Sequence, residues 1–179
     1  DGAGAVAVPQ LLRPRAVLPG GPPAPLWGEL FRYAGTDAEA RTEVAATLLG
    51  VAPEAPPGTR FLYSNASYMI AGAIGERRGA LPWQERIQRD LFAKLGITTA
   101  GFGPPGSEDA TAQPWGHKAA GKGPVPVFAD NPPSLGPAGT VHMALRDWAK
   151  FAALHLGVVP EVDGVPLLTY STAPTGTAR

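Results

Sequence analysis

The sequence contains no cysteine among its 179 residues. This absence excludes disulfide bonds, thiolate nucleophiles and cysteine-bound metal ions from any account of its function. It leaves the cellular compartment open, because secreted proteins can also lack cysteine.

The sequence also lacks long apolar runs and an excess of either charge. No apolar stretch approaches the ~20 residues of a transmembrane helix, so we expect no membrane span. Lys and Arg together number 15, as do Asp and Glu, so nothing favours binding to nucleic acid or to an anionic membrane. The opening residues, DGAGAVAV, include no initiator Met and no basic region of a signal peptide. We therefore expect the sequence to begin inside a longer chain.

What the sequence has in abundance is glycine and proline, with 23 and 21 residues, beside an apolar fraction of 44%. The apolar fraction is ample for a hydrophobic core, and the glycine and proline content favours long loops. The length suits one domain or a part of something larger. No fixed repeat and no alternation of strands with helices is indicated.

Apolar spacing and capping residues predict helices that alternate with irregular segments. Thr36 and Glu39 form the Thr-x-x-Glu pattern of a capping box, and a glycine stands where each helix is expected to end. The predicted helices span residues 36–50, 64–79, 82–96 and 143–156. We expect an irregular Pro/Gly-rich lead over 1–35, a helical lobe over 36–157 with an irregular stretch at 97–139, and a tail over 158–179.

The stretch PGTRFLYSNASYMIAGAIG at residues 57–75 raises the question of function. It places Tyr63, Ser64 and Asn65 together at the start of a predicted helix. Ser and Asn are both favoured helix N-caps, so these residues could serve only to start the helix. The alternative is that they form half of an active site.

Three segments in a fixed order favour the active site. They are the PGT-x-F-x-Y-S-N turn that ends at Asn65, the LG-x-T-x-x-GFG segment at 95–103, and the PAG-then-Asp-Trp helix around Asp147. Together they resemble the serine β-lactamase family in its broad sense, which includes class C β-lactamases, DD-carboxypeptidases and related esterases and amidases. The resemblance covers about residues 9–170. It implies a multi-domain α/β fold, of which this chain would supply a mostly α-helical part with little of the sheet.

The resemblance also implies roles for two side chains. Tyr63 would take part in proton transfer beside the nucleophilic serine, and Asn65 would hydrogen-bond the substrate amide or the catalytic lysine. A phenol has an ordinary pKa of about 10 and needs nearby positive charge to ionise at neutral pH. Lysines supply that charge in the family. Ser64 would be the variable middle residue and not the nucleophile.

The nucleophile motif of this family, S-x-x-K, is absent from the sequence. None of the five serines is followed by lysine three residues later. The third motif, K-T-G or H-x-G on a strand, is also absent, and we interpret His155-Leu156-Gly157 as the end of a helix. LLRPRAVLPG at 11–20 resembles a segment that follows the nucleophile in the family, with Pro14 and Val17 in place of its usual His and Gly. We therefore expect this chain to begin after its nucleophile and to be inactive alone.

The remaining polar candidates are weaker. The three histidines, His117, His142 and His155, show no zinc-binding spacing, so no metal and no other cofactor is expected. Trp115 and His117 either line a substrate cleft or anchor a loop. Asp147 is expected to support its own helix and not to act as a catalytic acid.

Two functions therefore stay open at the level of sequence. The first is part of a serine hydrolase that acts on β-lactams, D-amino-acid peptides or small esters. The second is a non-catalytic remnant or a module that binds a peptide or another partner, which the missing S-x-x-K favours. In either case the helices would lack the sheet that covers them, so we expect self-association through exposed apolar surface.

Overall fold

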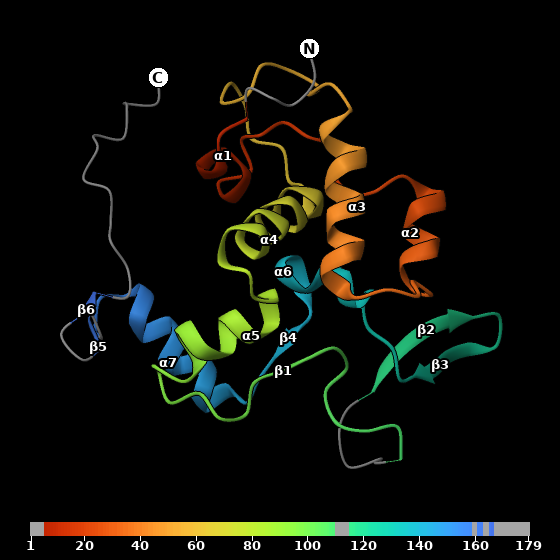
Figure 1. Cartoon of the computed structure of the whole chain (residues 1–179). Coiled ribbons are helices and arrows are strands. Elements are labelled where there is room, and N and C mark those ends of the chain that lie inside the picture. The colour runs from red at the N-terminus through yellow and green to blue at the C-terminus, as the bar shows by residue number, and fades with distance from the viewer. Residues whose placement is uncertain (1–5, 110–114, 159–160, 163–164, 167–179) are drawn as a thin grey trace.

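The computed structural model describes residues 6–109, 115–158, 161–162 and 165–166 (Figure 1). The α-helices are α1 (Val8–Leu12), α2 (Ala24–Leu30), α3 (Asp37–Leu49), α4 (Asn65–Gly79), α5 (Trp83–Ile87), α6 (Gly136–Gly139) and α7 (Leu145–His155). A π-helical turn η2 (Gln88–Phe92) follows α5, and a 3-10 turn η3 (Pro133–Leu135) precedes α6. The strands are β1 (Gly101–Phe102), β2 (Gly116–Ala120), β3 (Gly123–Val127), β4 (Val141–His142), β5 (Glu161–Val162) and β6 (Val165–Pro166).

The hydrophobic core lies between α3 and α4, which lie side by side near the centre of Figure 1. The buried residues of α3 recur every three or four positions, which places them on one face of the helix. They are Ala40, Arg41, Val44, Ala45 and Leu48. α4 presents Ala66, Met69 and Ile70 to the same core. α1 and the segment around Leu18 cover one end of it.

The strands form three separate antiparallel pairs. β1 pairs with β4, β2 with β3, and β5 with β6, with Gly101 opposite His142 and Gly116 opposite Val127. Each sheet has two strands among the described residues. The prediction of a mostly helical chain with little sheet is therefore confirmed.

The helix ends that depend on short-range capping lie where the sequence predicts them. The Thr36 hydroxyl accepts from the Glu39 N–H at 3.2 Å, and the Glu39 carboxylate accepts from the Thr36 N–H at 2.7 Å, which is the predicted capping box. α4 ends at Gly79 as predicted. The third predicted helix, over 82–96, consists of α5 and the π-helical turn η2, which ends at Phe92. The predicted end at Gly96 falls four residues further on, in a turn where Gly96 has a φ of +61°.

The prediction that residues 1–35 are irregular is wrong for two segments, α1 and α2. Both helices carry a proline in their first turn, Pro9 and Pro25. Proline has no N–H to lose there, and its fixed φ suits the start of a helix. Residues that we interpreted as helix breakers are therefore helix starters.

The prediction that 97–139 is irregular is also wrong in part, because this stretch contains β1, the β2–β3 hairpin, η3 and α6. The hairpin was missed because β3 carries Pro124 and Pro126, and proline inside a strand argues against a central strand. Here each strand of the hairpin has a partner on one side only, so the prolines are tolerated at an edge. The division of the chain into lead, lobe and tail stays a prediction.

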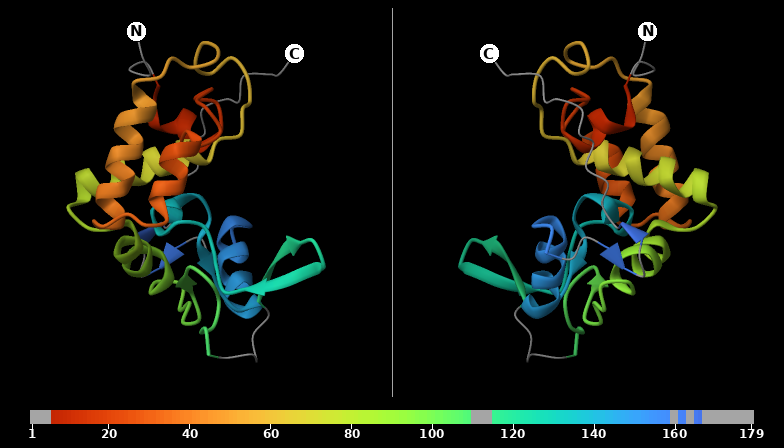
Figure 2. Two further views of the ribbon diagram at one scale, coloured as in Figure 1. Left: turned by 90° about the vertical axis from the view of Figure 1, so that its right-hand side faces the viewer. Right: turned by 90° about the vertical axis from the view of Figure 1, so that its left-hand side faces the viewer.

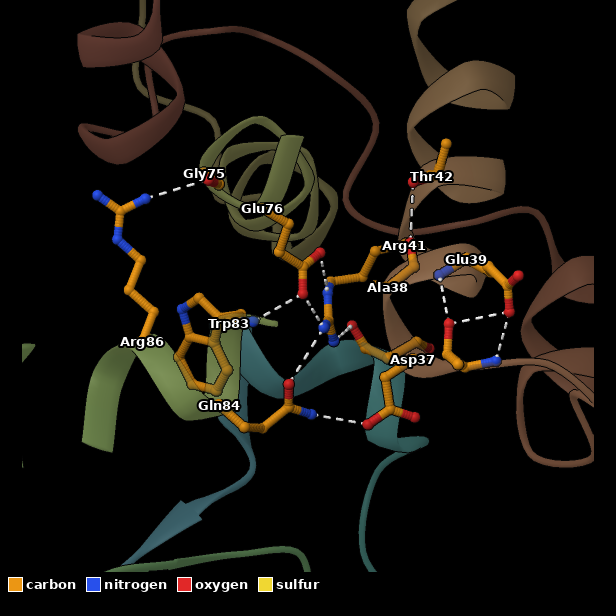
Figure 3. A network of polar contacts seen from close by, with 12 residues as sticks. Asp37, Ala38, Glu39, Arg41, Thr42, Gly75, Glu76, Trp83, Gln84 and Arg86 are labelled. Carbon is orange, nitrogen blue, oxygen red and sulfur yellow. Dashed lines mark hydrogen bonds and ion pairs between the residues drawn. The ribbon is translucent and has the colours of Figure 1, made fainter. Parts of the chain in front are cut away.

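A buried arginine joins four elements of the helical part (Figure 3). Arg41 of α3 is 0% exposed. Its guanidinium forms a bidentate ion pair with Glu76 of α4, with an Nε–Oε2 distance of 3.0 Å. It also donates to the carbonyl oxygen of Ser134 in η3 at 3.3 Å and to Oε1 of Gln84 in α5 at 3.2 Å.

The partners of Arg41 are themselves hydrogen-bonded. The backbone N–H of Trp83 donates to Oε1 of Glu76 at 2.8 Å, and the Gln84 amide donates to Oδ2 of Asp37 at 2.7 Å. A buried charge is tolerated when its remaining hydrogen-bonding groups are satisfied in this way. The network therefore fixes the positions of α3, α4, α5 and η3 relative to one another.

We predict that Arg41→Ala lowers the free energy of unfolding by about 3–5 kcal/mol, because it leaves the charge of Glu76, whose side chain is 9% exposed, without a cationic partner. Urea denaturation followed by circular dichroism measures this loss. Arg60→Ala is the control, because Arg60 pairs with Glu54 where both side chains are 50% exposed. That variant is expected to lose at most about 1 kcal/mol. Equal losses in the two variants would contradict the role assigned to Arg41.

Candidate functional site

The segment that leads into α4 is extended, and its side chains alternate between solvent and core. Phe61 and Tyr63 are 65% and 58% exposed, whereas Ser64 is 0% exposed. Ser64 has φ −151° and ψ 112°, the conformation of a β-strand. In such a backbone successive side chains point to opposite sides. The phenol of Tyr63 therefore points outward while the hydroxyl of Ser64 points into the protein.

Residues 14–20 run beside this segment and hold it through hydrogen bonds. The N–H of Leu62 donates to the carbonyl oxygen of Pro14 at 2.9 Å, and the N–H of Asn65 donates to that of Gly20 at 2.8 Å. The Ser64 hydroxyl donates to the carbonyl oxygen of Pro19 at 2.6 Å. This set of bonds fixes the backbone on both sides of Tyr63.

Ser64 is also the N-cap of α4, because its Oγ accepts from the N–H of Ser67 at 3.1 Å. The predicted capping role is thus confirmed. It does not exclude the predicted active site, since capping uses Ser64 and leaves the two neighbouring side chains free to meet.

Tyr63 and Asn65 do meet. The Tyr63 hydroxyl donates to Oδ1 of Asn65 at 2.9 Å. The carboxamide nitrogen of Asn65 keeps its two N–H donors for other partners. The pair lies at the N-terminus of the 15-residue helix α4, where the helix dipole favours negative charge. Chemically, the arrangement offers a phenol that can exchange a proton and an amide that can orient a carbonyl group.

Val17, within the supporting segment, has a left-handed backbone with φ +57° and a side chain that is 0% exposed. The resemblance described above implies glycine at this position. The left-handed conformation costs about 1–2 kcal/mol for a residue with a Cβ. Burial of the valine side chain contributes about 1.5–3 kcal/mol, which offsets that cost.

The structure places Trp115 and His117 on a different element from Tyr63 and Asn65. His117 lies in β2 opposite Pro126 of β3 and is exposed. The Trp115 ring lies 5.8 Å from the Phe128 ring, measured between centroids, at the base of the hairpin. The hairpin projects from the helices to one side (Figure 2). The two rings thus pack together at the base of the hairpin. Whether Trp115 and His117 line a substrate cleft or anchor a loop stays a prediction.

Asp147 is a structural carboxylate, as predicted. Its Oδ1 forms an ion pair with Lys150 in the same helix, α7, at 2.7 Å. Its Oδ2 also accepts from the N–H groups of Thr98 and Thr99 at 2.8 and 2.9 Å and from the Thr99 hydroxyl at 2.8 Å. The side chain is 3% exposed. Asp147 therefore ties the loop after η2 to the start of α7, a long-range contact that the sequence did not indicate.

These contacts hold the pKa of Asp147 well below its ordinary value of 3.8, first through Lys150 and then through Thr99 and Thr98. A carboxylate whose pKa is lower in the folded chain stabilises the fold above about pH 4 and loses this contribution as the pH falls toward its folded pKa. We predict that Asp147→Asn is less stable than the wild type at pH 7 and loses less stability on acidification to pH ~2.5.

Melting temperatures measured across this range test the prediction. Leu154→Ala is the control, since it removes a buried side chain of the same helix that carries no charge. Its melting curve is expected to shift by a similar amount at every pH. A pH dependence in Asp147→Asn that equals that of the wild type would show that Asp147 does not couple protonation to folding.

The described residues offer neither a cluster of metal ligands nor a membrane-spanning helix. None of their His, Asp and Glu side chains gather in groups of three or more that could hold a metal ion. None of the described helices is long and apolar enough to cross a membrane. His142 instead bonds through Nδ1 to the carbonyl oxygen of Gly103 at 2.8 Å, and the ring of His155 packs on Phe151 with centroids 4.5 Å apart.

Solved structures share this fold. The D-stereospecific amidohydrolase of a Streptomyces species superposes on 86% of the chain with a TM-score of 0.65 and 20% identity, over 47% of its own length. The octameric penicillin-binding protein homologue of Pyrococcus abyssi matches 90% of the chain with a TM-score of 0.63 and 22% identity, over 36% of its own length. The chain therefore shares the fold of these two proteins.

Sequence comparison leads to the same group. Penicillin-binding protein 4 of Amycolatopsis lactamdurans is 31% identical over 130 residues, which are 69% of this chain and 33% of that protein. The family model described as Beta-lactamase matches residues 1–175. The chain belongs to the Beta-lactamase family, so the resemblance drawn from its three segments is confirmed. It spans about a third of the length of this penicillin-binding protein.

Proposed function

We propose that this chain is part of a serine hydrolase that cleaves β-lactams, D-amino-acid peptides or small esters by acyl transfer through a serine. The observation that carries the proposal is the contact between the Tyr63 hydroxyl and Oδ1 of Asn65, on a backbone fixed from both sides by residues 14–20. Family membership supports the reaction class. A D-amino acid amidase among the structural relatives supports the substrate class.

In the proposed reaction a serine oxygen attacks the carbonyl carbon of the substrate, and the bond to the amine or alcohol breaks. Tyr63 passes the proton of the serine to the leaving group. Asn65 donates an amide N–H to the substrate and holds the carbonyl in place. Water then hydrolyses the acyl-serine ester and releases the acid. Both side chains reach solvent at the N-terminus of α4, so a substrate has access to them.

The serine and lysine of S-x-x-K are not among these 179 residues. The proposed acyl transfer therefore needs both groups from outside them, and the 179-residue chain is not expected to form a covalent adduct by itself. The same absence favours the second candidate, a non-catalytic module that binds a peptide or another partner. A full-length product that is acylated by a fluorescent penicillin would support the hydrolase, and one that binds ligand without acylation would support the module.

We predict that Tyr63→Phe lowers the acylation rate of the full-length gene product by about 100-fold or more, because proton transfer by a positioned group contributes about that much. Stopped-flow measurement with a fluorescent penicillin reports the rate, and circular dichroism reports the fold. Tyr68→Phe is the matched control, since it removes a phenol hydroxyl that donates to the carbonyl of Leu12. That variant is expected to keep the wild-type rate. A wild-type rate in Tyr63→Phe would remove Tyr63 from the mechanism.

We also propose that the chain self-associates through the exposed apolar side chains of α7 and its end. Leu145, Trp148, Leu156 and Val158 are between 52% and 81% exposed. Solvent-exposed apolar groups that gather on one element mark an interaction surface. The octameric state of the Pyrococcus abyssi homologue supports association within the family.

The prediction is a mass above that of the 18.5 kDa monomer in light scattering, and a return toward monomer when Leu145 and Leu156 are both replaced by Lys. Replacing Phe61, which is 65% exposed elsewhere on the surface, with Lys is the control and is expected to leave the mass unchanged. A monomeric wild type that binds no hydrophobic dye would argue against association.

A further inference from the structure

Ser64 stands between the two proposed catalytic side chains and has no assigned role beyond the helix cap. We propose that Ser64 is a positioning residue, whose buried hydroxyl fixes the geometry in which Tyr63 and Asn65 meet. This inference rests on the proposed function for its catalytic meaning. Its structural content, that the contact between Tyr63 and Asn65 depends on Ser64, can be tested without any activity.

Side chains alternate between solvent and core in the extended segment that carries Tyr63 and Ser64. Neighbouring side chains of a strand point to opposite sides. The burial of the Ser64 side chain therefore requires that the Tyr63 side chain points to solvent. Asn65, two residues from Tyr63, lies on the same side as the phenol, and its Oδ1 accepts from that hydroxyl. Anything that holds Ser64 inward therefore holds the other two outward and together.

The Ser64 hydroxyl makes more hydrogen bonds than a helix cap requires. Capping of α4 needs only the bond from the N–H of Ser67 at 3.1 Å. The hydroxyl also donates to the carbonyl oxygen of Pro19 at 2.6 Å, which ties the first turn of the helix to the supporting segment. With one donated and one accepted bond, the side chain is fixed in a single orientation.

A substitution at position 64 removes one of the hydrogen bonds that hold this turn. Three hydrogen bonds join this turn to residues 14–20, from the N–H of Leu62, the hydroxyl of Ser64 and the N–H of Asn65. Two of these are backbone bonds and survive any substitution other than proline. The Ser64 hydroxyl alone depends on a side chain, so position 64 is where the support can be removed without rebuilding the backbone.

The side-chain amide of Asn65 is a direct probe of the contact. The sequence contains two asparagines, Asn65 and Asn131, so the second serves as an internal reference in nitrogen-15 NMR spectra of the 179-residue chain. Tyr63→Phe removes the phenol hydroxyl that donates to Asn65. Its spectrum therefore gives the chemical shifts of the Asn65 side-chain amide when this hydrogen bond is absent. We expect Ser64→Ala and Ser64→Gly to move the Asn65 resonances toward those positions and to leave Asn131 unchanged.

Thr36→Ala is the matched control, because Thr36 caps α3 through the same type of bond. It is expected to lower the melting temperature by about 2–4 °C without moving the Asn65 resonances. Ser64→Gly separates the loss of the hydroxyl from a loss of helix stability, because glycine is tolerated at an N-cap nearly as well as serine. Unmoved Asn65 resonances in both Ser64 variants would overturn the inference and reduce Ser64 to a cap.

The catalytic arm uses the full-length gene product and a fluorescent penicillin. We expect Ser64→Ala to lower the acylation rate about 10–100-fold, with a smaller change in KM, because misplaced reacting groups chiefly slow the chemical step. Thr36→Ala is expected to keep the wild-type rate. If the wild type is not acylated, the proposed function fails while the Asn65 resonances still decide the positioning role. If Ser64→Ala is acylated at the wild-type rate, the positioning role fails and the hydrolase stands.

Discussion

The ion pair between Arg41 and Glu76 is the contact on which the arrangement of the helices depends. Two charged groups in the interior are favourable only when geometry and hydrogen bonding are nearly complete, and here both carboxylate oxygens and all three guanidinium nitrogens have partners. The packing around the pair is correspondingly close. A Cβ at Gly72 would lie 2.4 Å from Cγ of Pro137, so α4 and α6 approach as closely as they do only because glycine stands at this position.

This contact and the candidate site lie at opposite ends of one helix. The interior pair holds the C-terminal half of α4, since Glu76 lies in its last turns, while Ser64 and the segment 14–20 hold its N-terminus. Because contacts hold α4 at both ends, the positions of its first residues are fixed relative to the core. The phenol of Tyr63 is exposed, but its backbone is joined to α4, which is packed in the hydrophobic core.

Sequence reasoning succeeded where structure is decided by neighbours along the chain. The capping box at Thr36 and the cap at Ser64 depend on contacts between residues three positions apart, and those are visible in a sequence. It failed where the deciding partner is distant. Arg41 gave no signal because Glu76, Gln84 and Ser134 lie 35 to 93 residues away, and the two prolines of β3 were interpreted without the edge position that accommodates them.

The candidate site was predictable to the same extent. Tyr63 and Asn65 are two residues apart, so their meeting follows from a local turn, whereas the support from Pro19 and Gly20 crosses 45 residues. The hydrogen bond from the Ser64 hydroxyl to Pro19 could not be predicted from the sequence for this reason.

The left-handed valine at position 17 has a consequence for how this segment can change over generations. Valine and glycine codons differ by a single base. One nucleotide change therefore replaces Val17 by glycine, which removes the buried side chain and relieves the strain of the left-handed backbone. The backbone strain of about 1–2 kcal/mol and the burial of about 1.5–3 kcal/mol oppose each other, so the exchange changes the stability by less than the burial alone. Genetic drift can move position 17 between the two states without passing through an unstable intermediate.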